Sequence, residues 1–244
     1  MTGYIFALTL RQLVFRRTTL LLLGLAAIPL LVAVVFRLGD SDTEPREFVV
    51  RVLCVALVVT AVLPLTALLF GTSVLGDELE DGTVVYLLTK PLDRWRILLP
   101  KLLAAWLLTW LLAMGSVAGS ALIVLGGDGG DVVWAFGLAT AAAALAYACV
   151  FILLSLVTTR ALIAGLVFVF IWEGAVSGIF EGIRYFAIRH YAIGLADWLL
   201  DEPDTILRAY VGGVTALVLS VIVVTIAGIY AIKRLERVEI REST

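Results

Sequence analysis

Six stretches of roughly 20 mostly apolar residues decide what this chain can fold into, because a helix needs that length to cross the hydrocarbon core of a bilayer. Only the fifth stretch contains a charged residue, Glu173. With 62% of its residues apolar and 16% charged, a soluble chain of 244 residues would leave much apolar surface in water. The sequence therefore predicts an all-α integral membrane protein with a single transmembrane domain over residues 1–244. The predicted spans are residues 18–36, 52–75, 102–125, 132–157, 161–180 and 211–232.

The distribution of Lys and Arg orients these spans, since cytoplasmic loops of membrane proteins are enriched in both residues. If both termini are cytoplasmic, 12 of the 18 Lys and Arg residues fall inside and 6 fall outside. The connection 126–131, GGDGGD, has no basic residue and is predicted to be a tight outer hairpin. Arg outnumbers Lys 15 to 3, which points to a GC-rich prokaryotic genome. We therefore expect a multi-pass protein of the prokaryotic plasma membrane with both termini in the cytoplasm.

The charged and metal-ligating residues argue against several classes of function. A net charge of −2 provides no basic field for nucleic acid. Cys54 and Cys149 lie in apolar runs, without the spacing of a disulfide framework or a metal site. An intramembrane hydrolase would need a Ser–His pair or two acids, but the single histidine, His190, lies outside the spans and Glu173 has no second intramembrane acid. We predict no catalytic, metal-binding or cofactor-binding residue on this chain.

Residues 4–17 precede the first span and combine apolar with basic side chains, which is typical of a helix lying in the membrane interface. Ile5 and Leu8 stand among Arg11 and Arg16 in this stretch. The alternative is that the arginines only flank the span on its cytoplasmic side. The first interpretation predicts an N-terminal interfacial helix.

The longest predicted cytoplasmic segment, residues 76–101, has a pattern of its own between the second and third spans. Acidic residues precede apolar ones, which suits a helix because its N-terminal end is partly positive. Pro91 ends that helix, and Asp93 can cap a second helix that leads into the third span. Leucines on a cytoplasmic helix either contact a protein partner or lie back on the lipid headgroups. The acids are Asp77, Glu78, Glu80 and Asp81, and the apolar residues are Val84, Val85, Leu87 and Leu88.

The predicted outer segment 181–208, between the fifth and sixth spans, is longer than a simple connection. Its aromatic and aliphatic residues, including Tyr185, Phe186, Tyr191 and Trp198, make it strongly amphipathic. Aromatic side chains prefer the membrane interface. We therefore predict a shallow re-entrant or interfacial helical hairpin, with a small surface helix as the alternative.

Glu173 lies 13 residues beyond Arg160, which is about 20 Å along a helix and places it past the bilayer midplane. A carboxylate at that depth usually faces a cavity or a partner, so Glu173 and the nearby Ser177 are candidates for a translocation path. The alternative is that Glu173 is neutral, or hydrogen-bonded at a break in the helix near the outer surface.

Small residues recur every four positions in two spans, a spacing that lets helices approach closely. Packing within one chain and a seam between two chains are both open. These residues are Gly115 and Gly119 in the third span, and Gly174, Gly178 and Gly182 in and after the fifth.

The segment 76–101 resembles a motif of the type-2 ABC exporter permeases. That motif consists of an acid, variable residues, Gly-Thr, a leucine pair, a small polar residue, Pro and a basic residue. The resemblance, together with the number of spans and their orientation, extends over essentially the whole chain. The matching residues are Glu78, Glu80, Gly82, Thr83, Leu87, Leu88, Thr89, Pro91 and Arg94, followed by Lys101.

The resemblance implies that the segment is a coupling helix that docks in a groove of a separate cytoplasmic ATPase. It also implies two ATPase copies and a second permease chain, either identical or different. The docking residues would be Glu78, Glu80, Gly82, Thr83, Val84, Leu87, Leu88, Pro91 and Arg94.

The sequence lacks the G-x-x-x-x-G-K-[ST] loop that binds nucleotide phosphates, so ATP and Mg²⁺ would be held by the partner and this chain would not itself be an enzyme. The expected function is a membrane-spanning permease subunit, and the alternative is a channel or secondary carrier without an ATPase. Apolar spans favour an amphiphilic cargo over a hydrophilic one. Peptides, drugs and lipids all stay open, as does a role in maturing an extracytoplasmic metalloenzyme.

Overall fold

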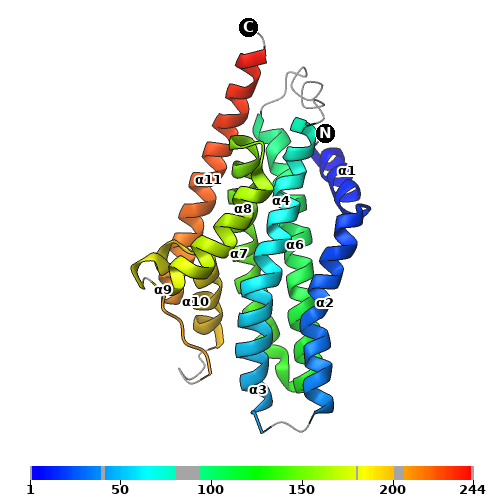
Figure 1. Cartoon of the computed structure of the whole chain (residues 1–244), viewed down its shortest axis with the longest axis vertical. Helices are drawn as coiled ribbons and strands as arrows, with labels where there is room; N and C mark the ends of the chain where they lie inside the picture. The colour runs from blue at the N-terminus through cyan, green and yellow to red at the C-terminus, as the bar shows by residue number, and fades with distance from the viewer. Residues whose placement is uncertain (1, 40–41, 81–93, 180, 201–205, 243–244) are drawn as a thin grey trace.

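The computed structural model describes residues 2–39, 42–80, 94–179, 181–200 and 206–242, and in these ranges the chain is helical with no strand. Long helices run side by side in an elongated bundle (Figure 1). In chain order the elements are α1 (Thr2–Val14), α2 (Arg17–Leu38), α3 (Pro45–Glu47), η1 (Phe48–Val62), α4 (Leu63–Glu80), α6 (Arg94–Leu125), η2 (Gly126–Gly129), α7 (Gly130–Val157), α8 (Ala161–Val167), η3 (Phe168–Val176), α9 (Ser177–Ile179), η4 (Glu181–Phe186), α10 (Ile188–Leu200) and α11 (Gly213–Glu242). Of the η elements, η1 and η3 are π-helical and η2 and η4 are 3-10 helices.

Five helical stretches of the described chain are long and apolar enough to cross a membrane. The prediction of an all-α, multi-pass membrane protein is therefore confirmed. The third stretch is 63 residues long and contains both α6 and α7, which are joined by η2 and pack against each other. The predicted count of six crossings requires this stretch to cross twice, and it stays a prediction. The five stretches are Arg17–Leu38, Pro45–Gly76, Trp95–Val157, Ala161–Ile179 and Gly213–Leu235.

Helix α7 is the centre of the bundle, because it packs against α4, α6, α10 and α11. Its sequence contains eight alanines, and small side chains let neighbouring helix backbones approach closely. Three large aromatic side chains of this helix, Phe136, Tyr147 and Phe151, are fully buried in the bundle. A helix surrounded in this way accounts for the near-continuous hydrophobicity of the predicted span 132–157.

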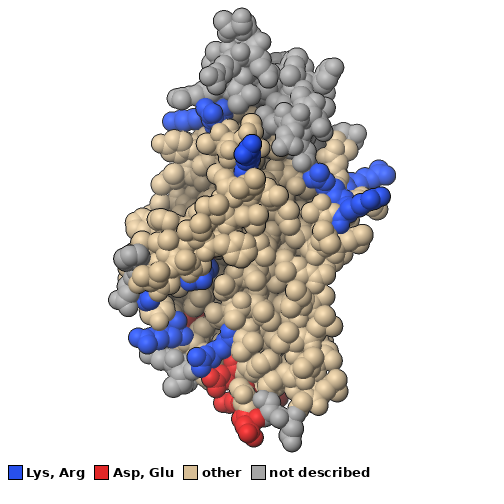
Figure 2. All heavy atoms as spheres, in the orientation of Figure 1, with Lys and Arg blue, Asp and Glu red and all other residues tan. Residues whose placement is uncertain are grey.

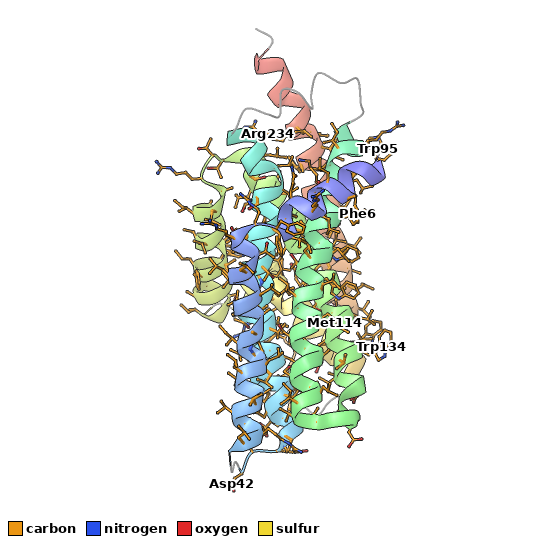
Figure 3. All side chains as sticks on the ribbon, turned by 90° about the vertical axis from the view of Figure 1, so that its right-hand side faces the viewer. Phe6, Asp42, Trp95, Met114, Trp134 and Arg234 are labelled. Carbon is orange, nitrogen blue, oxygen red and sulfur yellow. The ribbon has the colours of Figure 1, made fainter. Side chains whose placement is uncertain are left out.

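The two ends of the bundle differ in what they carry. Phe6, Trp95 and Arg234 lie at one end and Asp42 at the other (Figure 3), and we name these the Arg234 end and the Asp42 end. Helix α1 packs on α6 at the Arg234 end and lies across the bundle rather than along it. Basic side chains are found at the Arg234 end and on the flank near the Asp42 end, where acidic side chains also gather (Figure 2).

Several polar side chains of α6 hydrogen-bond to backbone carbonyls of neighbouring helices. Ser116 of α6 donates to the Ala26 carbonyl of α2 at 2.6 Å. Trp106 and Trp110, also on α6, donate to the Ala141 and Gly137 carbonyls of α7, both at 2.9 Å. These bonds fix the rotation of α6 relative to its neighbours.

The predicted small-residue positions have different surroundings. Gly119 lies against Leu30 of α2, with 3.1 Å between the position of an added Cβ and the leucine side chain. An added Cβ would meet nothing within 4 Å at Gly115, Gly178 or Gly182, and at Gly174 only the carbonyl of Val169 in the preceding turn. Among these residues, Gly119 alone lies at a close contact between helices of this chain.

The tightest backbone approach is instead at Gly194 of α10. An added Cβ at Gly194 would lie 2.2 Å from the Val211 carbonyl oxygen. We expect Gly194→Ala to lower stability by about 1–3 kcal/mol, because the backbone of the chain before α11 would have to move. Thermal unfolding of the purified protein in detergent measures the effect.

The matched control is Gly178→Ala, where an added Cβ meets nothing within 4 Å. Alanine in an open helical position should be neutral or slightly stabilising. Equal melting temperatures for Gly194→Ala and Gly178→Ala would contradict the close packing of α10.

Candidate functional site

Glu173 is a buried carboxylate in the π-helical stretch η3, only 2% exposed. π-Helical turns occur often at functional sites, since they displace side chains from the regular helix register. The residue lies on Ala161–Ile179, the fourth of the five stretches that are long and apolar enough to cross a membrane. A buried carboxylate in such a stretch needs hydrogen-bond donors from the protein, because burying a charge without partners is costly.

Two donors from different helices bind the Glu173 carboxylate. The hydroxyl of Tyr147 on α7 donates to one carboxylate oxygen. The backbone N–H of Ile188, the first residue of α10, donates to the other at 2.8 Å. The first N–H groups of a helix have no partner within that helix and carry partial positive charge. The carboxylate therefore caps α10 and ties it to α7, which is the hydrogen-bonded alternative of the sequence analysis.

Ser177, the other predicted path residue, belongs to the same cluster and is fully buried. Its hydroxyl donates to the Glu173 carbonyl at 2.5 Å and accepts from the Arg189 guanidinium at 3.0 Å. Arg184 donates to the Ser177 carbonyl at 3.4 Å. The structure thus brings the two predicted residues together, facing the interior of this chain.

The chain between α9 and α10 is fastened by further bonds. The indole N–H of Trp172 donates to the Phe186 carbonyl at 3.2 Å. The hydroxyl of Tyr191 donates to the Tyr185 carbonyl at 2.6 Å. The predicted outer segment 181–208 thus contains a 3-10 helix, η4, and an α-helix, α10, and its residues 201–205 lie outside the described residues. Helix α10 packs on α7 and α11, and its Tyr191, Ala192 and Ala196 are buried.

Most of the predicted ATPase-docking residues fall outside the described residues. Within the described chain, Glu78 and Glu80 lie in the last turn of α4, and Arg94 begins α6. Gly82, Thr83, Val84, Leu87, Leu88 and Pro91 lie outside it.

The helices on either side of this segment are joined by Lys101. Its side chain is 2% exposed, and its ammonium group donates to the Val74 carbonyl of α4 at 3.1 Å. Because a buried ammonium is costly unless it is well bonded, this contact holds the start of α6 against the end of α4.

A comparison with protein families now decides the class of this bundle. The family model described as "ABC-2 family transporter protein" matches residues 6–237. The chain belongs to the ABC-2 transporter family. No curated protein matches the sequence. Members of the ABC-2 family are the membrane subunits of ABC transporters, which agrees with the resemblance seen in residues 76–101.

Sequence reasoning missed Tyr147 and Arg189 as members of the Glu173 cluster. Tyr147 carries a hydroxyl in an alanine-rich helix, and a buried tyrosine hydroxyl nearly always has a partner. The sequence therefore indicates that the Tyr147 hydroxyl has a hydrogen-bond partner, but it does not identify which residue that partner is. Arg189 lies in a segment that was assigned to the outer surface, so its bond to an intramembrane serine could not be predicted.

We expect Glu173→Ala to destabilise the protein by about 1–3 kcal/mol for each of the two donors left unpaired. Tyr147→Phe removes one donor and leaves the carboxylate on Ile188, so its effect should be smaller than that of Glu173→Ala. Thermal unfolding in detergent, followed by tryptophan fluorescence, measures both.

Thr225→Val is the control, because it removes an exposed side-chain hydrogen bond on α11 that contributes little to stability. If Glu173→Ala melted at the wild-type temperature, the carboxylate would not hold α10 in place.

Proposed function

We propose that this ABC-2 family protein is the permease subunit of an ABC exporter, which couples ATP hydrolysis by a separate ATPase to movement of an amphiphilic substrate. The observation that carries the proposal is the family match over residues 6–237, on a bundle with five stretches that are long and apolar enough to cross a membrane. The sequence has no nucleotide-binding loop, so ATP and Mg²⁺ belong to the partner. Two ATPase copies and a second permease chain complete the transporter.

In this proposal the Arg234 end is cytoplasmic and the chain crosses the membrane six times, twice within Trp95–Val157. Helices α6 and α7 are 32 and 28 residues long, so each is long enough for one crossing. The turn between them, η2, lies at the same end as Asp42 (Figure 3), and the starts of α1 and α6 lie at the Arg234 end. The positive-inside rule applied to the sequence favours the same orientation.

We propose that movement of the ATPase is transmitted to this chain through the coupling helix in residues 76–101. The bond from Lys101 to Val74 supports this role, because it holds together the two helices that flank the segment. A displacement at the segment would then move α4 and α6 together. Both helices pack on α7, so the displacement would reach the centre of the bundle.

Glu173 and Ser177 stay candidates for the translocation path, and their geometry suggests how they would act. Both face the interior of this chain and bond to the first residues of α10. We therefore propose that they respond to substrate through the position of α10, which a change in their hydrogen bonds would alter.

The orientation is tested by labelling single cysteines. We expect a cysteine placed at Asp128 to react with a membrane-impermeant thiol reagent added outside intact cells. A reporter fused after Thr244 should be active only in the cytoplasm. The two buried native cysteines, Cys54 and Cys149, should remain unlabelled. Labelling that places both positions on one side would exclude the six-crossing topology, which has three crossings between residues 128 and 244.

The ATPase contact is tested by Leu87→Asp combined with Leu88→Asp in the full chain. Each buried leucine contributes roughly 1.5–3 kcal/mol, so we expect the affinity for the ATPase to fall about 100-fold or more. Pull-down in detergent measures binding, and ATP hydrolysis by the complex measures coupling.

Leu38→Asp is the control, because Leu38 is an exposed leucine at the far end of α2 from the docking segment. Wild-type ATPase binding by the double variant would mean that residues 76–101 are not the coupling element. If the wild-type chain bound no ATPase at all, an ATPase-independent carrier would become the better proposal.

A further inference from the structure

A pocket of about 500 Å³ lies between η1, α10 and the chain that leads into α11. Its polar lining consists of Arg51, His190, Arg208 and Tyr210. Apolar side chains, including Val55 and Ile193, form the rest of the wall. The volume is within the range of small-molecule sites, which bind an apolar body and orient it with a few polar groups.

Among the described residues, the charged side chains that line the pocket are those of Arg51 and Arg208. Arg51 pairs with Glu47 one turn earlier on its own helix at 2.6 Å, and its side chain remains 58% exposed. Arg208 is exposed, and its guanidinium lies 5.5 Å from the centre of the Tyr210 ring. Arg184 lies on the same ring at 3.8 Å. Cation–π contacts hold these guanidinium groups around Tyr210, and the concentration of positive charge favours an anion.

His190 provides the second, independent sign of a ligand. Its side chain is 7% exposed, and neither ring nitrogen has a hydrogen-bond partner in the described part of the chain. Its ring packs edge to face on the ring of Tyr210, with 6.1 Å between the two ring centroids. Buried polar groups in proteins are nearly always paired, so an unpaired imidazole on the wall of a pocket indicates a bound group.

The protonation state of His190 determines which hydrogen bonds its ring can make with a ligand. Burial, together with the positive charges of Arg189 and Arg184, lowers the pKa of His190 to about 4. The imidazole is therefore neutral near pH 7, with one N–H donor and one acceptor nitrogen. A neutral donor in a pocket that is also lined by two arginines suits an anionic oxygen, which accepts the N–H while the arginines balance its charge.

We propose that this pocket binds the anionic headgroup of an amphiphile, a phosphate or a carboxylate, with His190 donating to it and Arg51 and Arg208 supplying the charge. The apolar wall would contact the part of the molecule next to the headgroup. The ligand could come from the membrane or from the aqueous side. Because the pocket is built entirely from this chain, its occupancy does not depend on the ATPase.

The test uses the single histidine of the chain as the probe. The full chain, purified with a tag that contains no histidine and labelled with ¹⁵N-histidine, is placed in nanodiscs of phosphatidylcholine. His190 is then the only imidazole observed by NMR. In one arm the nanodiscs contain increasing amounts of phosphatidylglycerol, and in the other inorganic phosphate is added to the solution.

We expect a saturable shift of the His190 nitrogen signals in at least one arm. A shift with phosphatidylglycerol alone means a lipid headgroup as the source, and a shift with phosphate as well means that the pocket also accepts anions from water. Arg208→Gln should weaken binding about tenfold, the size expected for losing one hydrogen bond to a charged group.

Arg37→Gln is the matched control, because it makes the same change at an exposed arginine in the last turn of α2, outside the pocket. The melting temperature of each variant shows whether it is folded, and His190→Gln provides a second variant followed by lipid co-purification. The proposal is overturned if neither anion shifts the His190 signals, or if Arg208→Gln and Arg37→Gln reduce binding equally.

Discussion

Backbone N–H and C=O groups inside a bilayer have no water to bond with, so each must find its partner within the protein. Continuous helices meet this requirement along most of the chain. The start of α10 does not meet it, because the first N–H groups of α10 lack hydrogen-bond partners within their own helix. Glu173 supplies the missing acceptor from η3, and Tyr147 of α7 supplies a donor to the same carboxylate. A charged residue in a membrane-spanning stretch is thus explained by the backbone it satisfies.

The same cluster links the start of α10 to the centre of the bundle. Tyr147 is part of α7, the alanine-rich helix on which α4, α6, α10 and α11 pack. Helix α10 approaches the chain before α11 closely enough that Gly194 has no space for a Cβ. The position of α10 is therefore defined on one side by a carboxylate and on the other by backbone contact. By contrast, Gly174 and Gly178 are exposed and lie away from the close contacts of this chain.

These contacts form a continuous route between the two ends of the protein. The proposed coupling segment is flanked by α4 and α6, which Lys101 joins. Both helices pack on α7, and α7 reaches α10 through Tyr147 and Glu173. His190, two residues after Ile188 in the first turn of α10, lines the proposed anion pocket. Movement of α10 would change that pocket, so these contacts connect the Arg234 end of the bundle to the proposed anion pocket.

The sequence by itself determined the class of protein and the positions of its long apolar helices, because a bilayer forces every apolar stretch of sufficient length into a helix whatever its neighbours are. It also identified Glu173 and Ser177 as unusual, since a carboxylate in an apolar run is visible without a structure. It could not show that Tyr147 and Ile188 bind Glu173, that Gly194 rather than Gly178 lies in a close contact, or that His190 lies buried on a pocket wall. Those facts depend on how the helices are rotated and packed. Tyr147 and Glu173 meet only because α7 and η3 present particular faces to each other. The sequence of a helix that is apolar on nearly every side does not indicate which face turns toward a neighbour, so this is decided by the tertiary structure.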